Sequence, residues 1–260
     1  MIVYPNAKIN IGLKVLNKRE DGFHNLESIF YPVPWYDILE INRSENFEFK
    51  SFGLKIKGKP GDNLVIKAYR LVKDKFNIPN CKIHLQKQIP MGAGLGGGSA
   101  DAAFTITALN KLFNLNISID QMIKMADSLG SDCSFFIENK PKLVTGKGEI
   151  LKDIDFNLNG YYIKLVNPEI HISTKVAFEN LEIEPHHQPT LNTLTPQQLF
   201  KDNLLAVNDF EKGIFNLYPI IKHIKNQLIK EGALYASMTG TGSTVYGIFR
   251  TKPKTTFIPI

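Results

Sequence analysis

Residues Pro90 to Ala103 read PMGAGLGGGSADAA and place five glycines within seven positions. An alternating strand pattern precedes them, and a helix pattern follows from about Ala100. Glycine lets several backbone N–H groups converge on one point, and the start of a helix adds the positive end of its dipole. An anionic phosphate is the natural ligand of such a loop. A flexible linker would not account for the ordered patterns that adjoin both ends.

The same loop partly matches the dinucleotide-binding fingerprint. Gly92, Gly94 and Gly97 satisfy GxGxxG, and Asp120 follows roughly where a ribose-binding acid is expected. A strand that leads into a dinucleotide-binding fold is buried on both faces and reads as a continuous apolar run. Lys82–Ile89 alternates instead, so the parallel-sheet context is missing.

Two other phosphate loops fit less well. A P-loop ends in Lys-Ser or Lys-Thr, where this chain has Gly98-Ser99. The glycine loop of protein kinases is accompanied by His-Arg-Asp, Asp-Phe-Gly and Ala-Pro-Glu, and none of these occurs in the sequence. The phosphate loop therefore belongs to another class.

The composition bounds the class of protein. The chain has 260 residues, of which 43% are hydrophobic and 22% charged, which excludes collagen-like and disordered classes. This length corresponds to one large domain or two small ones. The formal net charge of +6 raises the local concentration of anionic partners, a condition that small phosphorylated ligands satisfy as well as nucleic acid does.

The cysteines and the apolar segments indicate the cellular compartment in which the protein is expected. Cys81 and Cys133 form no CxxC pair, so the sequence supports neither a disulfide framework nor a cysteine zinc site. The first residues lack the pattern of a secretory signal, and no apolar stretch is long enough to span a bilayer. We expect a cytoplasmic protein.

Strand patterns dominate the early chain. Ala7–Val15 alternates apolar and polar residues, which predicts a half-exposed strand with Lys8 and Asn10 on one face. Further alternating or β-rich segments predict an antiparallel sheet with one covered face. These segments are Asp37–Asn42, Asn46–Lys50, Leu54–Lys57 and Lys82–Gln88.

Helical spacing predicts a helix over Leu64–Phe76 and a second one from about Ala100. Ser118 and Gln121 have capping-box spacing and open a third helix that stops at Gly130, and Ser134–Ile137 is predicted to be a strand. Beyond about Asp153 the composition changes, which indicates a second, smaller unit. It contains a strand pattern at Tyr161–Val166 and helical patterns at Pro196–Leu205 and Pro219–Gly232.

Three segments carry a resemblance to a known superfamily. Pro90–Ala103 resembles the second motif of the GHMP kinases, named for galactokinase, homoserine, mevalonate and phosphomevalonate kinases. Lys8-Ile9-Asn10 and Met238–Ser243 agree with that superfamily in order and spacing. Within it, Asp21–Phe30 is similar to the signature of the 4-diphosphocytidyl-2-C-methyl-D-erythritol kinases. The likeness spans nearly the whole chain.

The resemblance implies an α+β fold with two domains. Residues 1–153 would form a ribosomal-protein-S5-like, ATP-binding N-terminal domain, and residues 154–260 a ferredoxin-like C-terminal domain. The implied activity is ATP-dependent phosphorylation of the 2-hydroxyl of 4-diphosphocytidyl-2-C-methyl-D-erythritol in non-mevalonate isoprenoid biosynthesis. Another GHMP kinase, similar to mevalonate or homoserine kinase, is the alternative. A dinucleotide-binding oxidoreductase and a basic RNA-binding protein are rivals that do not account for the three motifs in order.

The resemblance assigns catalysis to two residues. Asp132 would orient or deprotonate the attacking hydroxyl, and Lys8 would favour the ionised form of that aspartate. The family commonly has proline where this chain has Ser134, which leaves the rigidity of the aspartate's backbone open. Without the resemblance, Asp132 could be a solvated turn residue and Lys8 an edge-strand lysine that faces water.

ATP is the implied co-substrate, together with Mg²⁺, which offsets charge on the phosphate oxygens. The Ser99 hydroxyl is available to phosphate or Mg²⁺, Asp101 caps the helix or lies near metal, and the sequence shows no dedicated metal cage. The residues assigned to the nucleotide are Pro90, Met91, Gly92, Ala93, Gly94, Leu95, Gly96, Gly97, Gly98 and Ser99.

The cytidyl substrate would meet aromatic and polar groups, because an aromatic face stacks on a base and a nearby polar group reads its edge. Phe178 could equally be a core residue. The residues assigned to substrate are Asn10, Phe23, His24, Thr174, Phe178, Gly240, Thr241 and Gly242. The expected partners are this small molecule and ATP, with no nucleic acid and no membrane, in a monomer or a homodimer.

Overall fold

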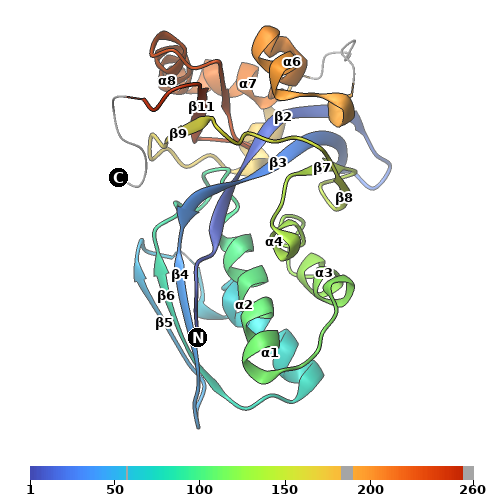
Figure 1. Cartoon of the computed structure of the whole chain (residues 1–260), viewed down its shortest axis with the longest axis vertical. Helices are drawn as coiled ribbons and strands as arrows, with labels where there is room; N and C mark the ends of the chain where they lie inside the picture. Colours follow the sequence, from blue (N-terminus) through green and yellow to red (C-terminus); the bar gives the residue numbers. More distant parts are fainter. Residues whose placement is uncertain (57, 183–189, 254–260) are drawn as a thin grey trace. The chain divides into compact units, whose positions relative to one another are not determined.

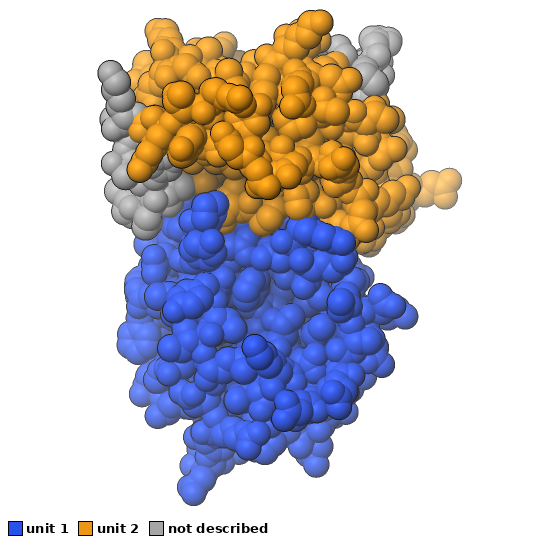
Figure 2. All heavy atoms as spheres, in the orientation of Figure 1, with its two compact units in different colours: residues 1–7, 34–91, 96–140 blue, residues 8–33, 92–95, 141–260 orange. Residues whose placement is uncertain are grey.

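The computed structural model describes residues 1–56, 58–182 and 190–253. Its contacts divide the chain into two compact units, which Figure 2 shows in different colours. Unit 1 comprises residues 1–7, 34–91 and 96–140, and unit 2 comprises residues 8–33, 92–95 and the described part of 141–260. The units divide the chain differently from the boundary between residues 153 and 154, which stays a prediction about family domains.

Unit 1 contains a four-stranded sheet in the order β1-β4-β6-β5. Its strands are β1 (Ile2–Val3), β4 (Ile38–Arg43), β5 (Glu48–Gly53) and β6 (Cys81–Lys87). The β1–β4 and β4–β6 pairs are antiparallel, as expected, but β5 runs parallel to β6. A parallel pair needs a long crossover, and the helix between these two strands supplies it. The expectation of a wholly antiparallel sheet was therefore wrong at this edge.

The helices of unit 1 are η1 (Pro60–Asp62), α1 (Leu64–Phe76), α2 (Gly97–Phe113), α3 (Ile119–Asp127) and α4 (Phe135–Glu138). Helices α1 and α2 pack against one face of the sheet, and α3 and α4 pack against α2 (Figure 1). The range of α1 is as predicted, and the capping box of Ser118 and Gln121 opens α3 as predicted. Helix α3 ends before Gly130, and α2 begins at Gly97, slightly earlier than expected.

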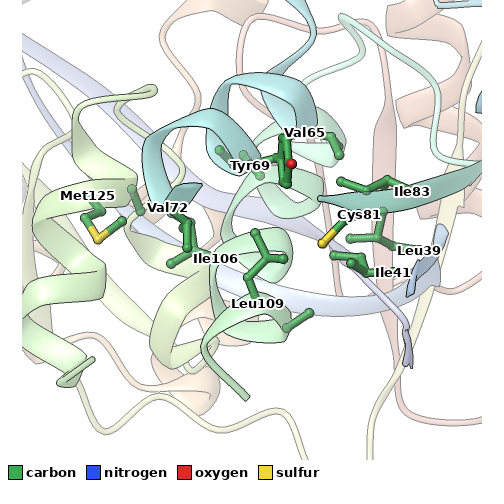
Figure 3. Packing of buried hydrophobic residues seen from close by; sticks show 14 of the residues in the cluster. Leu39, Ile41, Val65, Tyr69, Val72, Cys81, Ile83, Ile106, Leu109 and Met125 are labelled. Carbon is green, nitrogen blue, oxygen red and sulfur yellow. The ribbon is translucent and has the colours of Figure 1, made fainter. Parts of the chain in front are cut away.

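The core of unit 1 joins α1 and α2 to the sheet (Figure 3). The residues labelled there are Leu39, Ile41, Val65, Tyr69, Val72, Cys81, Ile83, Ile106, Leu109 and Met125. Burying one aliphatic side chain of this size contributes roughly 1.5–3 kcal/mol. Because this cluster packs α2 against β6, it fixes the two elements that the glycine segment connects.

Two strand predictions in unit 1 were wrong. Ser134–Ile137 is not a strand, because the neighbours Phe135 and Phe136 are both buried and form helix α4. A half-exposed strand would have sent these two side chains to opposite faces. Leu54–Lys57 forms no strand in its described part: β5 ends at Gly53, where φ is 76°. Lys57 lies outside the described residues.

The first sheet of unit 2 has the order β2-β3-β7-β8. Its strands are β2 (Asn6–Lys18), β3 (His24–Tyr36), β7 (Lys142–Thr145) and β8 (Ile150–Asp153), and the first two begin or end in unit 1. Every residue of β2 from Asn6 to Val15 is buried. The alternation predicted a half-exposed strand, which was wrong because the polar side chains of β2 are also covered and hydrogen-bonded.

The second sheet of unit 2 is antiparallel, in the order β10-β11-β9. Its strands are β9 (Tyr162–Val166), β10 (Tyr235–Met238) and β11 (Val245–Phe249). The helices of unit 2 are α5 (Thr174–Glu179), η2 (Leu191–Thr193), α6 (Pro196–Lys201), η3 (Asn203–Ala206), α7 (Phe210–Leu217) and α8 (Pro219–Lys230). The predicted helix over Pro196–Leu205 divides at Asp202, whose φ of −140° is not helical and whose carboxylate accepts from Leu204 N. No helix in the described part of the chain is long and apolar enough to cross a membrane.

Candidate active site

The glycine segment divides between the two units. Residues 92–95 belong to unit 2, and residues 96–99 open helix α2 in unit 1. Gly94 and Gly96 have φ values of 78° and 70°, which L side chains rarely adopt. The segment thus needs glycine for its backbone path.

In unit 2, the loop packs against the turn that follows β10. The Thr239 hydroxyl donates to the Gly94 carbonyl (3.0 Å), and a Cβ on Gly94 would overlap the Thr239 carbonyl. Lys8 N donates to the Leu95 carbonyl (2.9 Å). The segment Met238–Ser243, which resembles a GHMP kinase motif, is therefore in contact with the glycine loop.

In unit 1, the first turn of α2 presents its amide groups. Ala100 N donates to the Gly96 carbonyl (2.9 Å), so the N–H groups of Gly97, Gly98 and Ser99 precede that first intrahelical bond. N–H groups in this position bind anions, and the helix dipole adds to the attraction. The geometry of this turn suits phosphate oxygens.

Asp132 is half-buried in the turn between α3 and α4. The next residue, Cys133, has its thiol within hydrogen-bonding reach of the Ser99 hydroxyl, which links this turn to the first turn of α2. Burial raises the pKa of the Cys133 thiol to about 11, and the neighbouring Asp132 charge adds to that shift. The turn that carries Asp132 and the start of α2 thus lie next to each other in unit 1.

Ser134 stands where the family usually has proline. Its φ is −61°, the value to which a proline ring restricts the backbone. Two hydrogen bonds within the turn also stabilise it. Cys133 N donates to the Gly130 carbonyl (3.0 Å), and the Ser134 hydroxyl donates to the Ser131 carbonyl (3.4 Å). The φ of Ser134 is therefore one that proline could also adopt, so the substitution does not require a different φ at this position.

Lys8 is buried in β2, with 3% of its surface exposed. Its ammonium donates to Asn10 Oδ1 (2.6 Å) and lies over the Phe30 ring, 4.5 Å from the centroid. The alternative of an edge-strand lysine that faces water is wrong for this residue. A lysine that is buried and held by an amide and an aromatic face has one preferred orientation.

Asn10 holds Lys8 through a chain of buried hydrogen bonds. Its Oδ1 accepts from Lys8 Nζ and lies 3.2 Å from Thr239 Oγ1, and its Nδ2 donates to Ser28 Oγ (3.0 Å). Ser28 Oγ in turn donates to the Gly12 carbonyl (2.6 Å). Ser28 was missed at the level of sequence, although a serine within the apolar run of β3 is a signal of a satisfied polar role.

The structure brings two of the predicted substrate residues together. The rings of His24 and Phe178 stack, with centroids 5.0 Å apart and planes 23° from parallel. Phe178 also meets the buried Phe210 edge-on, at 4.9 Å. Phe178 thus packs at the rim of the apolar cluster and also stacks on His24, and its assignment to substrate stays a prediction. Thr174 opens the same helix, α5, and is exposed.

Phe23, another of the predicted substrate residues, contacts a lysine. Its side chain is 57% exposed, and Lys147 Nζ lies 5.0 Å from its ring centroid. Lys147 was not singled out from the sequence. An exposed aromatic ring with an ammonium over its face remains available to a ligand.

Gly240, Thr241 and Gly242 form the turn between β10 and β11. The Gly240 carbonyl accepts from Asn208 Nδ2 (2.8 Å), which also donates to the Met238 carbonyl. A Cβ on Gly240 would lie 3.0 Å from Gly94 Cα, so this turn and the glycine loop approach each other closely.

Asp101 does not cap α2, so that expectation was wrong. The N-cap is Gly96, and Asp101 lies in the second turn, where its buried carboxylate accepts from Lys87 Nζ (2.9 Å). Lys87 reaches Asp101 because it is the last residue of β6 and lies on the same buried face of that strand as Cys81, Ile83 and Leu85. The alternation of β6 was a signal that could have pointed to a buried lysine.

Among the residues that the structure describes, no group of three or more His, Cys, Asp or Glu side chains is placed to hold a metal ion. Mg²⁺ at kinase sites keeps several waters and is bound largely through the substrate phosphates. The half-buried Ser99, beside the amides of α2, fits a metal that arrives with the nucleotide.

Two family models match the chain. The GHMP kinases N terminal domain matches residues 63–139, and the GHMP kinases C terminal model matches residues 197–256. A 4-diphosphocytidyl-2-C-methyl-D-erythritol kinase of Bacteroides fragilis is 45% identical over 98% of this chain and 94% of its own length. The kinase of the same name from Cytophaga hutchinsonii is 48% identical, with the same coverage. The chain belongs to this family of GHMP kinases.

A solved structure of a 4-(cytidine 5'-diphospho)-2C-methyl-D-erythritol kinase also matches. It is 27% identical, with a TM-score of 0.80 over 95% of this chain and 89% of its own. The homoserine kinase from Cytophaga hutchinsonii is 16% identical with a TM-score of 0.70, which shows the shared GHMP fold alone. The α+β GHMP kinase fold that the motifs implied is confirmed.

Proposed function

We propose that this protein transfers the terminal phosphoryl group of ATP to the 2-hydroxyl of 4-diphosphocytidyl-2-C-methyl-D-erythritol, which yields the 2-phosphate and ADP. The observation that carries the proposal is the 45–48% identity, over nearly the full chain, to kinases of that name. The reaction belongs to non-mevalonate isoprenoid precursor biosynthesis. The alternative of a mevalonate- or homoserine-type kinase has no comparable support, since those structural matches share only the fold.

The glycine segment, residues 90–99, holds the ATP phosphates in this proposal. The N–H groups of Gly97, Gly98 and Ser99 face the phosphate oxygens at the positive end of α2. Mg²⁺, when bound with the nucleotide, neutralises charge on the β- and γ-phosphate oxygens. Because phosphoryl transfer depends on positioning and charge stabilisation, a rigid loop is the main requirement.

Asp132 and Lys8 act on the acceptor hydroxyl. The Asp132 carboxylate accepts or orients the hydroxyl proton while the oxygen attacks the γ-phosphorus. The Lys8 ammonium stabilises the negative charge that develops, and its bonds to Asn10 keep it in one orientation. This preorganisation avoids reorientation of the lysine during the reaction.

The cytidyl end of the substrate binds at the aromatic pair of His24 and Phe178, with Phe23 and Thr174 beside it. An aromatic ring can stack on any base, and a ring nitrogen such as that of His24 can form a hydrogen bond with the edge of the base. Asn10 and residues 240–242 bind the end of the substrate that carries the acceptor hydroxyl. The partners are thus ATP and one small molecule, and we place the protein in the cytoplasm as a monomer or a homodimer.

The direct test measures ADP release by the purified protein with ATP, Mg²⁺ and 4-diphosphocytidyl-2-C-methyl-D-erythritol. Mevalonate and homoserine are run as separate acceptors. Turnover with the cytidyl substrate alone is the expected result. Activity with another alcohol, and none with the cytidyl compound, would keep the kinase fold and contradict the assigned substrate.

Replacement of Phe178 by leucine is expected to raise the KM for the cytidyl substrate by about tenfold, with kcat and the KM for ATP little changed. Loss of one base-stacking partner costs roughly 1–3 kcal/mol. Steady-state kinetics with each substrate varied in turn measure the change.

Two further variants separate stacking from packing. Phe178→Tyr keeps the ring and should restore the KM, and Phe52→Leu, at a half-exposed phenylalanine of unit 1, should leave it unchanged. If Phe178→Leu lowers only the melting temperature, Phe178 is a core residue and its assignment to the base is refuted.

A further inference from the structure

His171 lies in unit 2, on the segment between β9 and α5, and the proposed mechanism does not use it. Its side chain is exposed. A Cβ on Gly92 would come within 2.8 Å of both Cε1 and Nδ1 of the His171 ring, so the imidazole occupies the space that this glycine leaves free. The ring therefore contacts the first glycine of the segment that is proposed to hold phosphate.

The residues on either side of His171 are fixed in place. The Ser243 hydroxyl donates to the Ile170 carbonyl (2.5 Å). Ile172 is buried, and a Cβ on Gly242 would lie 3.1 Å from its Cδ1. The segment is thus packed against the turn between β10 and β11, which also contacts the glycine loop. An exposed side chain on such a fixed backbone loses little freedom when it binds a ligand.

The imidazole of His171 is a free hydrogen-bonding group in the described part of the chain. No hydrogen bond joins its ring nitrogens to another residue that the structure describes. An imidazole carries at least one N–H donor in either protonation state. Such a donor, exposed beside a glycine whose backbone a ligand can approach closely, is suited to an anionic oxygen.

His171 is also close along the chain to the proposed base site. It stands three residues before Thr174, which opens α5. Three residues of chain span at most about 11 Å. Phe178 of the same helix stacks on His24. The segment that carries His171 therefore links the aromatic pair to the glycine segment, within unit 2 alone.

The proposed substrate has the chemistry that this position requires. In 4-diphosphocytidyl-2-C-methyl-D-erythritol, a diphosphate joins the cytidine to the alcohol that is phosphorylated. With the base at His24 and Phe178 and the alcohol at Asn10, the diphosphate is the part of the molecule that connects the two. Its oxygens are charged acceptors, and hydrogen bonds to charged groups are stronger than those between neutral groups.

ATP is the other source of phosphate. Its phosphates are assigned above to the N–H groups of Gly97, Gly98 and Ser99, which open α2. Gly92, the residue that His171 contacts, stands five positions earlier, at the other end of the glycine segment. The position of His171 therefore favours the diphosphate of the cytidyl substrate over the phosphates of ATP.

We propose that His171 is a binding residue for the diphosphate of the cytidyl substrate, in which a ring N–H donates to a phosphate oxygen while the ring rests on Gly92. The inference rests on the proposed function, because it takes the base to lie at His24 and Phe178. The diphosphate does not react, so the contact is equally strong in the ground state and the transition state. It therefore lowers the KM for the cytidyl substrate and leaves kcat unchanged.

The test measures the dissociation constant of 4-diphosphocytidyl-2-C-methyl-D-erythritol by titration calorimetry of the whole protein without ATP, so that no transfer occurs. His171→Leu removes the N–H and keeps a side chain against Gly92, and it should raise this constant about tenfold, as expected for the loss of a hydrogen bond to a charged group. His171→Gln keeps an N–H donor and should recover most of the affinity.

Two further ligands show which part of the substrate His171 contacts. Cytidine lacks the diphosphate, so its dissociation constant should be the same for His171→Leu and the unmodified protein. Steady-state kinetics should show a KM for the cytidyl substrate raised about tenfold, with kcat and the KM for ATP within about twofold. An equal loss for cytidine, or a raised KM for ATP alone, would overturn the inference.

His223→Leu is the matched control, because His223 is an exposed histidine of α8 in the same unit. It should bind all three ligands as the unmodified protein does. The melting temperature of His171→Leu should change little, as is usual for an exposed side chain. A lower melting temperature with all ligands weakened alike would make His171 a packing residue and refute the inference.

The same measurements separate this inference from the proposed function. If the unmodified protein binds and phosphorylates the cytidyl substrate and His171→Leu does both equally well, the inference is wrong and the proposed function stands. If the unmodified protein neither binds nor phosphorylates that compound, the proposed function is contradicted and the inference with it.

Discussion

Asp132→Asn is expected to lower kcat by about 10²–10⁴-fold, the range in which a positioned general base contributes. Asparagine has nearly the same shape but cannot accept the hydroxyl proton. Because Asp132 lies in a turn beside Ser99 and Cys133, and not in the first turn of α2 itself, ATP binding should be largely kept. Stopped assays of ADP release give kcat, and equilibrium titration gives the dissociation constant for ATP.

Asp127→Asn serves as the control for this variant, since it removes an exposed carboxylate near the same turn. It should keep kcat within about twofold, as is usual for a surface substitution. If Asp132→Asn retains kcat within about tenfold of the unmodified protein, Asp132 is not the base. If it loses ATP binding and melts early, the residue is structural.

Lys8→Met is expected to lower kcat by about 10²–10³-fold with a smaller effect on either KM. Loss of a preorganised charge that acts in the transition state has an effect of this size. Methionine fills a similar volume over the Phe30 ring but leaves Asn10 Oδ1 without its ammonium donor. Full kinetics with both substrates, together with a melting curve, separate the loss of charge from a loss of stability.

Lys18→Met provides the comparison, because Lys18 is an exposed lysine at the end of the same strand. It should match the unmodified protein in kcat. A loss of kcat in both variants would indicate that the substitutions damage the strand or act through the change in net charge. A raised KM for the cytidyl substrate with kcat unchanged would move Lys8 from catalysis to ground-state binding.

The candidate site could be predicted in part because its residues sit in short, contiguous motifs. The glycine segment, Lys8 with Asn10, and Asp132 were each named from local sequence, and their assignments stay predictions until these variants are measured. Ser28, Lys87 and Asp37 escaped notice because each is an ordinary polar residue in its own segment. Their roles arise only where distant strands place them around Asn10 or Asp101.

Elements with a local signal were foreseen from the chain alone. Helix α1 follows from its periodic apolar face, and α3 follows from the capping box at Ser118, since both signals act within a few residues. The glycine segment likewise imposes its own backbone path. These features depend on steric and hydrogen-bonding rules that hold wherever the segment lies.

Tertiary contacts decided the rest. Phe135 and Phe136 form a helical turn instead of a strand because both rings are drawn into the interior. The burial of β2 from Asn6 to Val15 covers Lys8 and fixes its ammonium, and the buried face of β6 places Lys87 between two carboxylates. Alternation shows that the two faces of a strand differ, but only the neighbours that cover each face determine whether its polar groups meet water or one another.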